Sequence, residues 1–156
     1  MKDVPHGGVA WDQRLGNFGL NPSYAFEVRL HDVDHAGVMF FARLFVHAHD
    51  AYEAFMARQG MDLCAMIRAG ERLPVVHASA DYFQPLRHGE EITVDLEVET
   101  LGESSFTLAY SFYANAGLLA KAHTVHVYLD PHVNAAAPLP PSLRQLLQPH
   151  CKTLTT

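Results

Sequence analysis

The segment from His31 to Phe41 holds the residues of this chain whose types and spacing are best suited to chemistry. Two acids, Asp32 and Asp34, are followed by Gly37 and then by the start of a helical pattern. A carboxylate in a loop before a helix lies beside free backbone N–H groups and the positive end of the helix dipole. Those N–H groups stabilise a developing oxyanion while the carboxylate attacks a carbonyl or activates water. The segment therefore predicts acyl chemistry, with an ordinary helix cap as the alternative.

The same acids also resemble part of a calcium loop. Asp32, Asp34 and Gly37 match its spacing, but Ala36 stands where an acid or Asn belongs, and Arg43 stands where the bidentate Glu should be. The eleven histidines form no pair with chelating geometry on the predicted helix or strands. We therefore expect neither a metal ion nor any other cofactor.

One long helix and five strands are predicted to position this segment. Between Arg43 and Gln59, apolar residues fall on one stripe at helical spacing, and His47 lies largely outside that stripe. Two short helices are expected at 63–69 and at 143–148, the second capped by Ser142. Alternating apolar residues predict strands at 24–30, 73–83, 91–101, 105–113 and 118–129.

The order of these elements predicts an α+β fold. Strands joined by short connections are antiparallel neighbours, and the one long helix must cover the apolar face of the sheet. We therefore expect a curved antiparallel sheet of about five strands wrapped around a central helix. In the first strand, Leu30 is expected to face inward with its apolar neighbours. In the last strand, the residues expected to face inward are Leu119, Val125, Val127 and Leu129.

Composition indicates one globular domain. The 156 residues are 49% hydrophobic and 18% charged, and we expect an N-terminal arm at 1–23, a domain at 24–130 and a C-terminal tail at 131–156. With no signal peptide, no membrane span and two cysteines that are expected to be reduced, the sequence predicts a cytoplasmic protein. A net charge of −6 without a basic cluster argues against nucleic-acid binding, but an anionic ligand such as coenzyme A needs only a few local cations.

Two stretches resemble a known family. Asp32-Val33-Asp34-His35-Ala36-Gly37-Val38, followed by an aromatic pair and a long helix, resembles the active-site segment of the 4-hydroxybenzoyl-CoA thioesterase family of hotdog proteins. The stretch 73–85, with 87–94 after it, most resembles the thioesterases of that family that act on 1,4-dihydroxy-2-naphthoyl-CoA in quinone biosynthesis. The resemblance covers residues 24–129, most of the predicted core.

The resemblance implies roles for the residues of the first stretch. Asp34 matches the catalytic aspartate, which acts as nucleophile or as general base for water, and the backbone N–H of Phe41 matches the group that polarises the carbonyl. Gly37 lets the backbone approach the substrate closely, and Asp32 shapes the loop. The chain departs from the subgroup linked to the Tol–Pal system, which usually has His where Phe41 stands.

The resemblance also implies a substrate site shared between subunits. A homodimer or homotetramer is expected, with sheets joined edge to edge and active sites at the dimer interface. We expect substrate contacts from His35, Phe40, His77, Ser79 and Asp81; the last three instead face solvent if they belong to an ordinary strand. Arg87 and His88 are candidates for the phosphates of coenzyme A, with solvated turn residues as the alternative.

The function expected from these features is hydrolysis of a coenzyme A thioester of an aromatic acid, such as 1,4-dihydroxy-2-naphthoyl-CoA or 4-hydroxybenzoyl-CoA. A thioesterase for short- or medium-chain aliphatic acyl-CoA, a hydratase or dehydratase acting on fatty acyl thioesters, and a non-catalytic acyl-CoA-binding module are the alternatives. A hydratase would need an acid–histidine pair on the helix, to which His47 or His49 with Asp50 is a poor match. A binding module would have no turnover to lose when Asp34 is changed.

Overall fold

The computed structural model of the protein describes residues 23–115 and 117–152. All but the last residue of the arm expected at 1–23 therefore lies outside the described residues. The elements are β1 (Ser23–Glu27), η1 (Leu30–Asp32), α1 (Arg43–Arg58), α2 (Leu63–Arg68), β2 (Val75–Tyr82), β3 (Glu91–Leu101), β4 (Ser105–Ala114), β5 (Gly117–Val127), β6 (Leu129–Asp130), β7 (Ala135–Ala136), α3 (Pro141–Leu147) and η2 (Gln148–His150).

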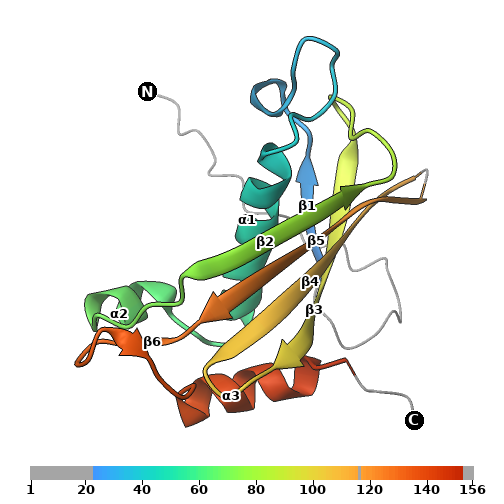
Figure 1. The fold of residues 1–156 in the computed structure, drawn as a ribbon. Coiled ribbons are helices and arrows are strands. Elements are labelled where there is room, and N and C mark those ends of the chain that lie inside the picture. The colour runs from blue at the N-terminus through green and yellow to red at the C-terminus, as the bar shows by residue number, and fades with distance from the viewer. Residues whose placement is uncertain (1–22, 116, 153–156) are drawn as a thin grey trace, which may run out of the picture.

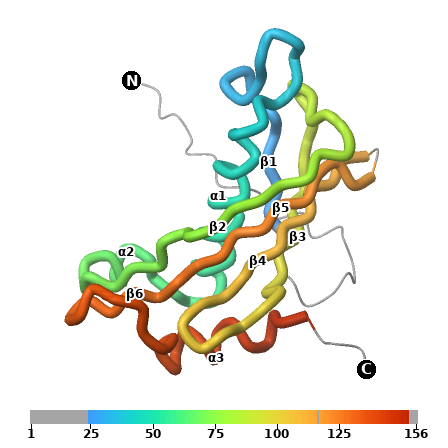
Figure 2. Tube along the Cα trace, in the orientation of Figure 1, coloured from blue at the N-terminus to red at the C-terminus, as the bar shows by residue number. Residues whose placement is uncertain are grey.

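Five strands form one antiparallel sheet in the order β1-β3-β4-β5-β2. Figure 1 shows that α1 crosses one face of this sheet, with α2 and α3 near one end and the loop between β1 and α1 at the other. The same course of the chain can be followed in the tube of Figure 2. The predicted α+β architecture, a sheet wrapped around one long helix, is confirmed.

The core lies between α1 and the inner face of the sheet. Every second residue is buried from Ile92 to Val98 in β3 and from Phe106 to Phe112 in β4, and the buried face of α1 meets them. Burying each large apolar side chain contributes about 1.5 to 3 kcal/mol, so this layer dominates the stability of the fold. Its largest fully buried members include Phe55, Leu44, Met56, Ile92, Leu96, Phe106, Leu108 and Phe112.

The inward face of β5 differs from the prediction. The pairing of β4 with β5 shifts register between Phe112 and Tyr113, and beyond this irregularity the even-numbered residues of β5 point toward α1. Ala120, Ala122, Thr124 and His126 are therefore buried. Leu119 is buried as predicted, but Val125, Val127 and Leu129 are only half-buried, so the prediction that these three face inward is wrong. A single irregularity exchanges the two faces of a strand because side chains alternate with a period of two.

Three smaller predictions are also wrong. Leu30 is 76% exposed because β1 ends at Glu27 and the chain turns through η1. His47 is buried, although it was expected outside the apolar stripe of α1. Helix α3 begins at Pro141 without a side-chain cap, so Ser142 does not cap it.

The residues beyond 130 contribute to the core. Leu139, Leu143 and Leu147 are all buried, the last two on α3. Proline at the start of α3 suits a position whose N–H has no partner within the helix. Within residues 23–115 and 117–152, no helix has both the length and the apolar character that crossing a bilayer requires.

A buried chain of polar groups runs through the core beside α1. Tyr110 Oη lies 3.0 Å from Thr124 Oγ1, which lies 2.9 Å from His126 Nε2. The other ring nitrogen of His126 lies 3.3 Å from the carbonyl oxygen of Leu73. Burial lowers the pKa of His126 to about 4, since removing the charged imidazolium from water outweighs the bond to Leu73. The folded protein therefore holds His126 neutral.

This pKa predicts a loss of stability in mild acid. The unfolded chain binds a proton at position 126 below the ordinary histidine pKa of about 6.5, whereas the folded protein resists protonation until about pH 4. The free energy of unfolding should therefore fall between these pH values, by up to about 3 kcal/mol from this group. His126→Gln, which does not titrate, should flatten that part of the curve in urea unfolding. Equal pH dependence in both proteins would contradict the assignment.

Candidate active site

Asp34 lies at the tip of the loop between β1 and α1. The loop folds back as a tight turn in which Gly37 N donates to Asp34 O at 3.0 Å and Asp34 N donates to Val38 O at 3.0 Å. Gly37 has φ +74°, a conformation that favours glycine. Asp34 Oδ1 accepts a 2.8 Å bond from Ala36 N, and the side chain is exposed. The turn thus presents the Asp34 carboxylate to solvent with one oxygen held by the backbone.

The segment before β3 holds this loop in place. Met39 N donates to Leu86 O at 2.7 Å, and His88 N donates to Gly37 O at 3.1 Å. Val38 forms an isolated bridge with Arg87. The two residues predicted to bind coenzyme A, Arg87 and His88, therefore lie directly beside the Asp34 turn with exposed side chains.

Asp32, in contrast, is fully buried and anchors the loop to α1. One carboxylate oxygen, Oδ1, lies 3.0 Å from both Arg43 Nε and Nη2 and 2.9 Å from His47 Nε2. The other accepts a 3.0 Å bond from Arg29 N, and Asp32 O accepts a 2.8 Å bond from Phe40 N. The two ends of the loop and the first turns of α1 thus meet at one side chain.

These bonds determine the charge of Asp32. Burial alone would raise the pKa of its carboxyl, but the bonds from Arg29 N, His47 and Arg43 together lower it below the ordinary value. Asp32 is therefore ionised at neutral pH and is committed to structure. His47 is itself held against Phe26, whose ring stacks on it with centroids 3.7 Å apart.

The start of α1 offers a free backbone donor. Within residues 23–115 and 117–152, the N–H of Phe41 has no hydrogen-bond partner, and no side chain caps the helix at Ala42. The carbonyl of Phe41 accepts a bond from the hydroxyl of Tyr82 at the end of β2. Phe40 and Phe41 are exposed, with ring centroids 4.8 Å apart. An uncapped helix start of this kind attracts a partial negative charge.

The predicted substrate residues fall into two groups. His35 and Phe40 lie on the loop that carries Asp34 and are exposed. His77, Ser79 and Asp81 pair with Val125, His123 and Lys121, and these six residues lie on the sheet face turned away from α1. Strand alternation directs these three side chains to the face opposite α1, and their contact with a substrate stays a prediction.

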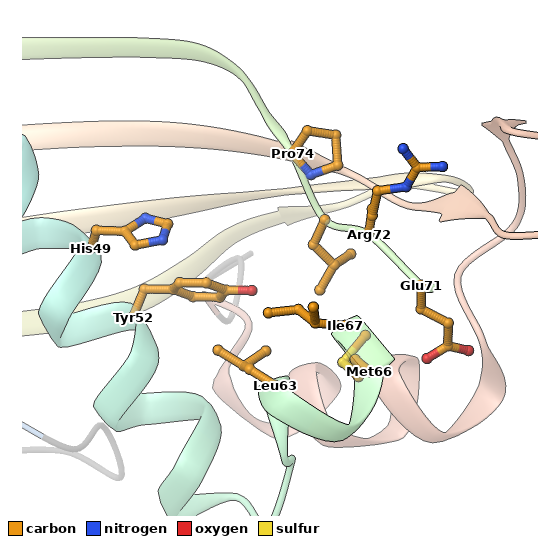
Figure 3. A pocket seen from close by; sticks show the side chains of 9 residues that line it. His49, Tyr52, Leu63, Met66, Ile67, Glu71, Arg72 and Pro74 are labelled. Atoms are coloured by element: carbon orange, nitrogen blue, oxygen red, sulfur yellow. The ribbon is translucent and has the colours of Figure 1, made fainter. Parts of the chain in front are cut away.

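Two cavities lie along α1, and Asp34 lines neither of them. The first, of about 290 Å³, separates α1 from α2 and is predominantly apolar (Figure 3). It is lined by His49, Tyr52, Leu63, Met66, Ile67, Glu71, Arg72, Leu73 and Pro74. The second, of about 260 Å³, lies between β1 and α1 and includes Asp32 and His47. In the described ranges, no three His, Cys, Asp or Glu side chains are grouped to hold a metal ion.

Sequence reasoning missed the first cavity. His49 and Tyr52 occupy α1, and Leu63, Met66 and Ile67 occupy α2, where an apolar stripe is the ordinary signature of a core. The space between α1 and α2 results from how these two helices pack against each other. No local pattern in the sequence distinguishes a stripe that lines a cavity from one that is fully packed.

Comparison with known proteins identifies relatives. Residues 28–147 match the model of a family described as the thioesterase-like superfamily. The 1,4-dihydroxy-2-naphthoyl-CoA hydrolase of Rippkaea orientalis is 38% identical over 80% of this chain and 94% of its own length. The corresponding hydrolase of Synechococcus elongatus is 36% identical over 80% of this chain and 95% of its own length.

Solved structures agree with the sequence relatives. The crystal structure of a 1,4-dihydroxy-2-naphthoyl-CoA thioesterase from Synechocystis superposes with a TM-score of 0.77 at 32% identity and covers 82% of this chain and 96% of its own. A gentisyl-coenzyme A thioesterase shares the fold at a TM-score of 0.73, with 24% identity over 81% of this chain and 99% of its own. The hotdog fold expected from the sequence is confirmed.

The contrast between the two loop acids makes a prediction. Asp32→Asn leaves the Arg43 charge without its buried partner, so the free energy of unfolding should fall by about 3 kcal/mol or more. Asp34→Asn changes an exposed side chain whose amide oxygen still accepts from Ala36 N, so it should cost less than about 0.5 kcal/mol. Urea unfolding of both variants at pH 7 measures this. Equal losses would contradict the assignment of Asp32 as the anchor.

Proposed function

The chain belongs to the thioesterase-like superfamily, and we propose that it hydrolyses the coenzyme A thioester of an aromatic acid, with 1,4-dihydroxy-2-naphthoyl-CoA as the first candidate. The observation that carries this proposal is the loop anchored by Asp32. It connects the exposed Asp34 turn to the residues just before α1, where, among the described residues, Phe41 N–H has no partner. The relatives named as 1,4-dihydroxy-2-naphthoyl-CoA hydrolases support the substrate. 4-Hydroxybenzoyl-CoA is the second aromatic candidate.

The proposed reaction adds water across the thioester bond. The carbonyl oxygen accepts a hydrogen bond from Phe41 N–H, and the positive end of α1 stabilises the charge that develops on that oxygen. Asp34 either attacks the carbonyl carbon and forms an anhydride that water then opens, or removes a proton from the attacking water. The bond to sulfur breaks, and coenzyme A leaves as its thiol once the thiolate takes up a proton.

Arg87 and His88 are proposed to bind the phosphates of coenzyme A. Both side chains are exposed, and both residues pair with the Asp34 turn through their backbones, His88 with Gly37 and Arg87 with Val38. Arginine pairs with phosphate through two parallel hydrogen bonds, so Arg87 is the stronger candidate. No other cofactor is needed for this reaction, since coenzyme A is part of the substrate.

The proposal includes a homodimer built through β2. This strand is an edge of the sheet, and seven of its eight residues are exposed. An exposed edge strand of this length presents unpaired N–H and C=O groups that favour pairing with a second copy. A two-fold axis perpendicular to the sheet would pair β2 antiparallel with its copy and continue the antiparallel order. Two such dimers would form a tetramer.

Antiparallel pairing would join the cavity of one subunit to the Asp34 loop of the other. The cavity includes Leu73 and Pro74, just before β2, whereas the bond between Tyr82 and Phe41 lies at the other end of β2. Within one subunit, His49 and Tyr52 lie about 12 to 16 Å along α1 from Phe41, at 1.5 Å per residue. In an aromatic thioester the ring is bonded directly to the thioester carbonyl. A substrate whose carbonyl lies at Phe41 N–H therefore cannot place its ring in the cavity of the same subunit. Across the dimer, the two ends of β2 come together.

Asp34→Asn should abolish most of the turnover. Because the amide neither attacks nor accepts a proton effectively, kcat for 1,4-dihydroxy-2-naphthoyl-CoA should fall at least about 100-fold, with substrate binding retained. Thiol release measures turnover, and calorimetry measures binding. Asp95→Asn, an exposed acid on the outer face of β3, is the matched control and should keep full activity. Unchanged turnover in Asp34→Asn would overturn the proposal.

The dimer predicts protected amides in β2. Each N–H on the free edge of a lone subunit would exchange quickly with solvent, whereas pairing with a second copy would slow that exchange by orders of magnitude. Hydrogen exchange followed by NMR should show slow exchange along all of β2, including the amides that do not bond to β5. Sedimentation should give two or four times the 17.3 kDa mass of the chain. Rapid exchange of alternate β2 amides in a monomeric protein would contradict the dimer.

A further inference from the structure

The cavity between α1 and α2 is lined by Tyr52, whose hydroxyl faces the open space. Tyr52 is only 3% exposed, and among residues 23–115 and 117–152 its hydroxyl has no hydrogen-bond partner. Figure 3 shows its ring projecting from α1 into the space bounded by Leu63 and Ile67. The ring of Tyr52 is therefore buried, while its hydroxyl is open to a ligand that enters the cavity.

The walls around this hydroxyl suit an aromatic ring. Leu63, Met66 and Ile67 come from α2, and Leu73 and Pro74 come from the segment before β2. Arg72 and Glu71 also line the space, but Figure 3 shows both side chains directed away from the Tyr52 hydroxyl. Sites for small molecules typically combine apolar walls with a few polar groups that fix orientation. Here Tyr52 is the most buried of the polar residues that line the cavity, whereas His49 is exposed.

Neighbouring side chains hold the Tyr52 ring in one orientation. The ring of His126 lies 4.6 Å from it and that of His49 lies 5.3 Å from it, centroid to centroid. His126 is in turn fixed by Thr124 and by the carbonyl of Leu73. Burial raises the pKa of Tyr52, with a smaller contribution from Tyr110, so the hydroxyl stays neutral and is able both to donate and to accept. The group is therefore positioned before any ligand arrives.

We propose that Tyr52 determines specificity by forming a hydrogen bond with a hydroxyl group on the aromatic ring of the acyl substrate. This rests on the proposed function and narrows it to thioesters of hydroxylated aromatic acids. A site built to hydrogen-bond a substrate hydroxyl discriminates strongly against the analogue that lacks it, because the protein group is then left unpaired in a desolvated place. An apolar cavity alone discriminates weakly between such rings.

The test compares two substrates that differ only in ring hydroxyls, 1,4-dihydroxy-2-naphthoyl-CoA and 2-naphthoyl-CoA. The native protein should prefer the hydroxylated thioester by about 100-fold in kcat/KM. Tyr52→Phe should lose about 10- to 100-fold on the hydroxylated thioester and little or nothing on the other. Its melting temperature should not fall, because among the described residues the hydroxyl makes no hydrogen bond to another protein group. Tyr113→Phe, the same change in β4 outside the cavity, should leave kcat/KM unchanged for both substrates.

The role of Tyr52 would be overturned if Tyr52→Phe lost kcat/KM equally on both thioesters. It would also be overturned if Tyr52→Phe kept the full preference for the hydroxylated thioester. A binding measurement distinguishes failure of the proposed role of Tyr52 from failure of the proposed catalysis. In the Asp34→Asn background, calorimetry should show that Tyr52→Phe weakens the hydroxylated thioester selectively, whatever the turnover of Asp34→Asn itself. If turnover survives in Asp34→Asn, Asp34 has no part in the mechanism, but the role of Tyr52 is still tested by the binding measurement. If neither thioester binds any variant, both proposals are overturned.

Discussion

The buried carboxylate of Asp32 is the interaction on which the site depends. A fully buried charge is tolerated only when its oxygens are satisfied, and those of Asp32 meet Arg29 N, Arg43 and His47. These partners come from both sides of the loop, so satisfying one carboxylate closes the loop onto the first turns of α1. The exposed Asp34 turn and the free Phe41 N–H are then held by the same anchor. One buried charge thus positions two groups that make no bond to each other.

Asp32 and Asp34 therefore divide two tasks that the sequence pattern alone does not separate. Both are aspartates two residues apart, and their neighbours look alike. In the structure one is buried and bonded on both oxygens, whereas the other is exposed and held by a single backbone N–H. A carboxylate that is fully occupied cannot attack a carbonyl, whereas one with a free oxygen at a turn can. Asp34 therefore has an oxygen free for chemistry, whereas both oxygens of Asp32 are bonded.

Most of the fold followed from the sequence because it rests on periodicity. The spacing of apolar residues identified α1, and alternation identified the strands of the sheet, since both patterns reflect burial of one face. The faces of β5 were reversed, because an irregularity in the pairing with β4 leaves no mark on the residues themselves. The burial of His47 was missed because its partner, Asp32, lies 15 residues away, and no local pattern reports such a pairing. The cavity was missed because Tyr52 has the spacing of a core residue.

In the proposed dimer, each active site combines the Asp34 loop of one subunit with the α1–α2 cavity of its partner. Mixed oligomers test this directly: Asp34→Asn is co-expressed with Leu63→Trp, which fills the cavity, and each protein carries its own tag. Each parent should be inactive, whereas dimers containing one copy of each retain one intact site. A random mixture should therefore recover about a quarter of the native activity, since half of its dimers are mixed and each of those has one of two sites intact. Absence of any recovered turnover in purified mixed dimers would contradict the shared site.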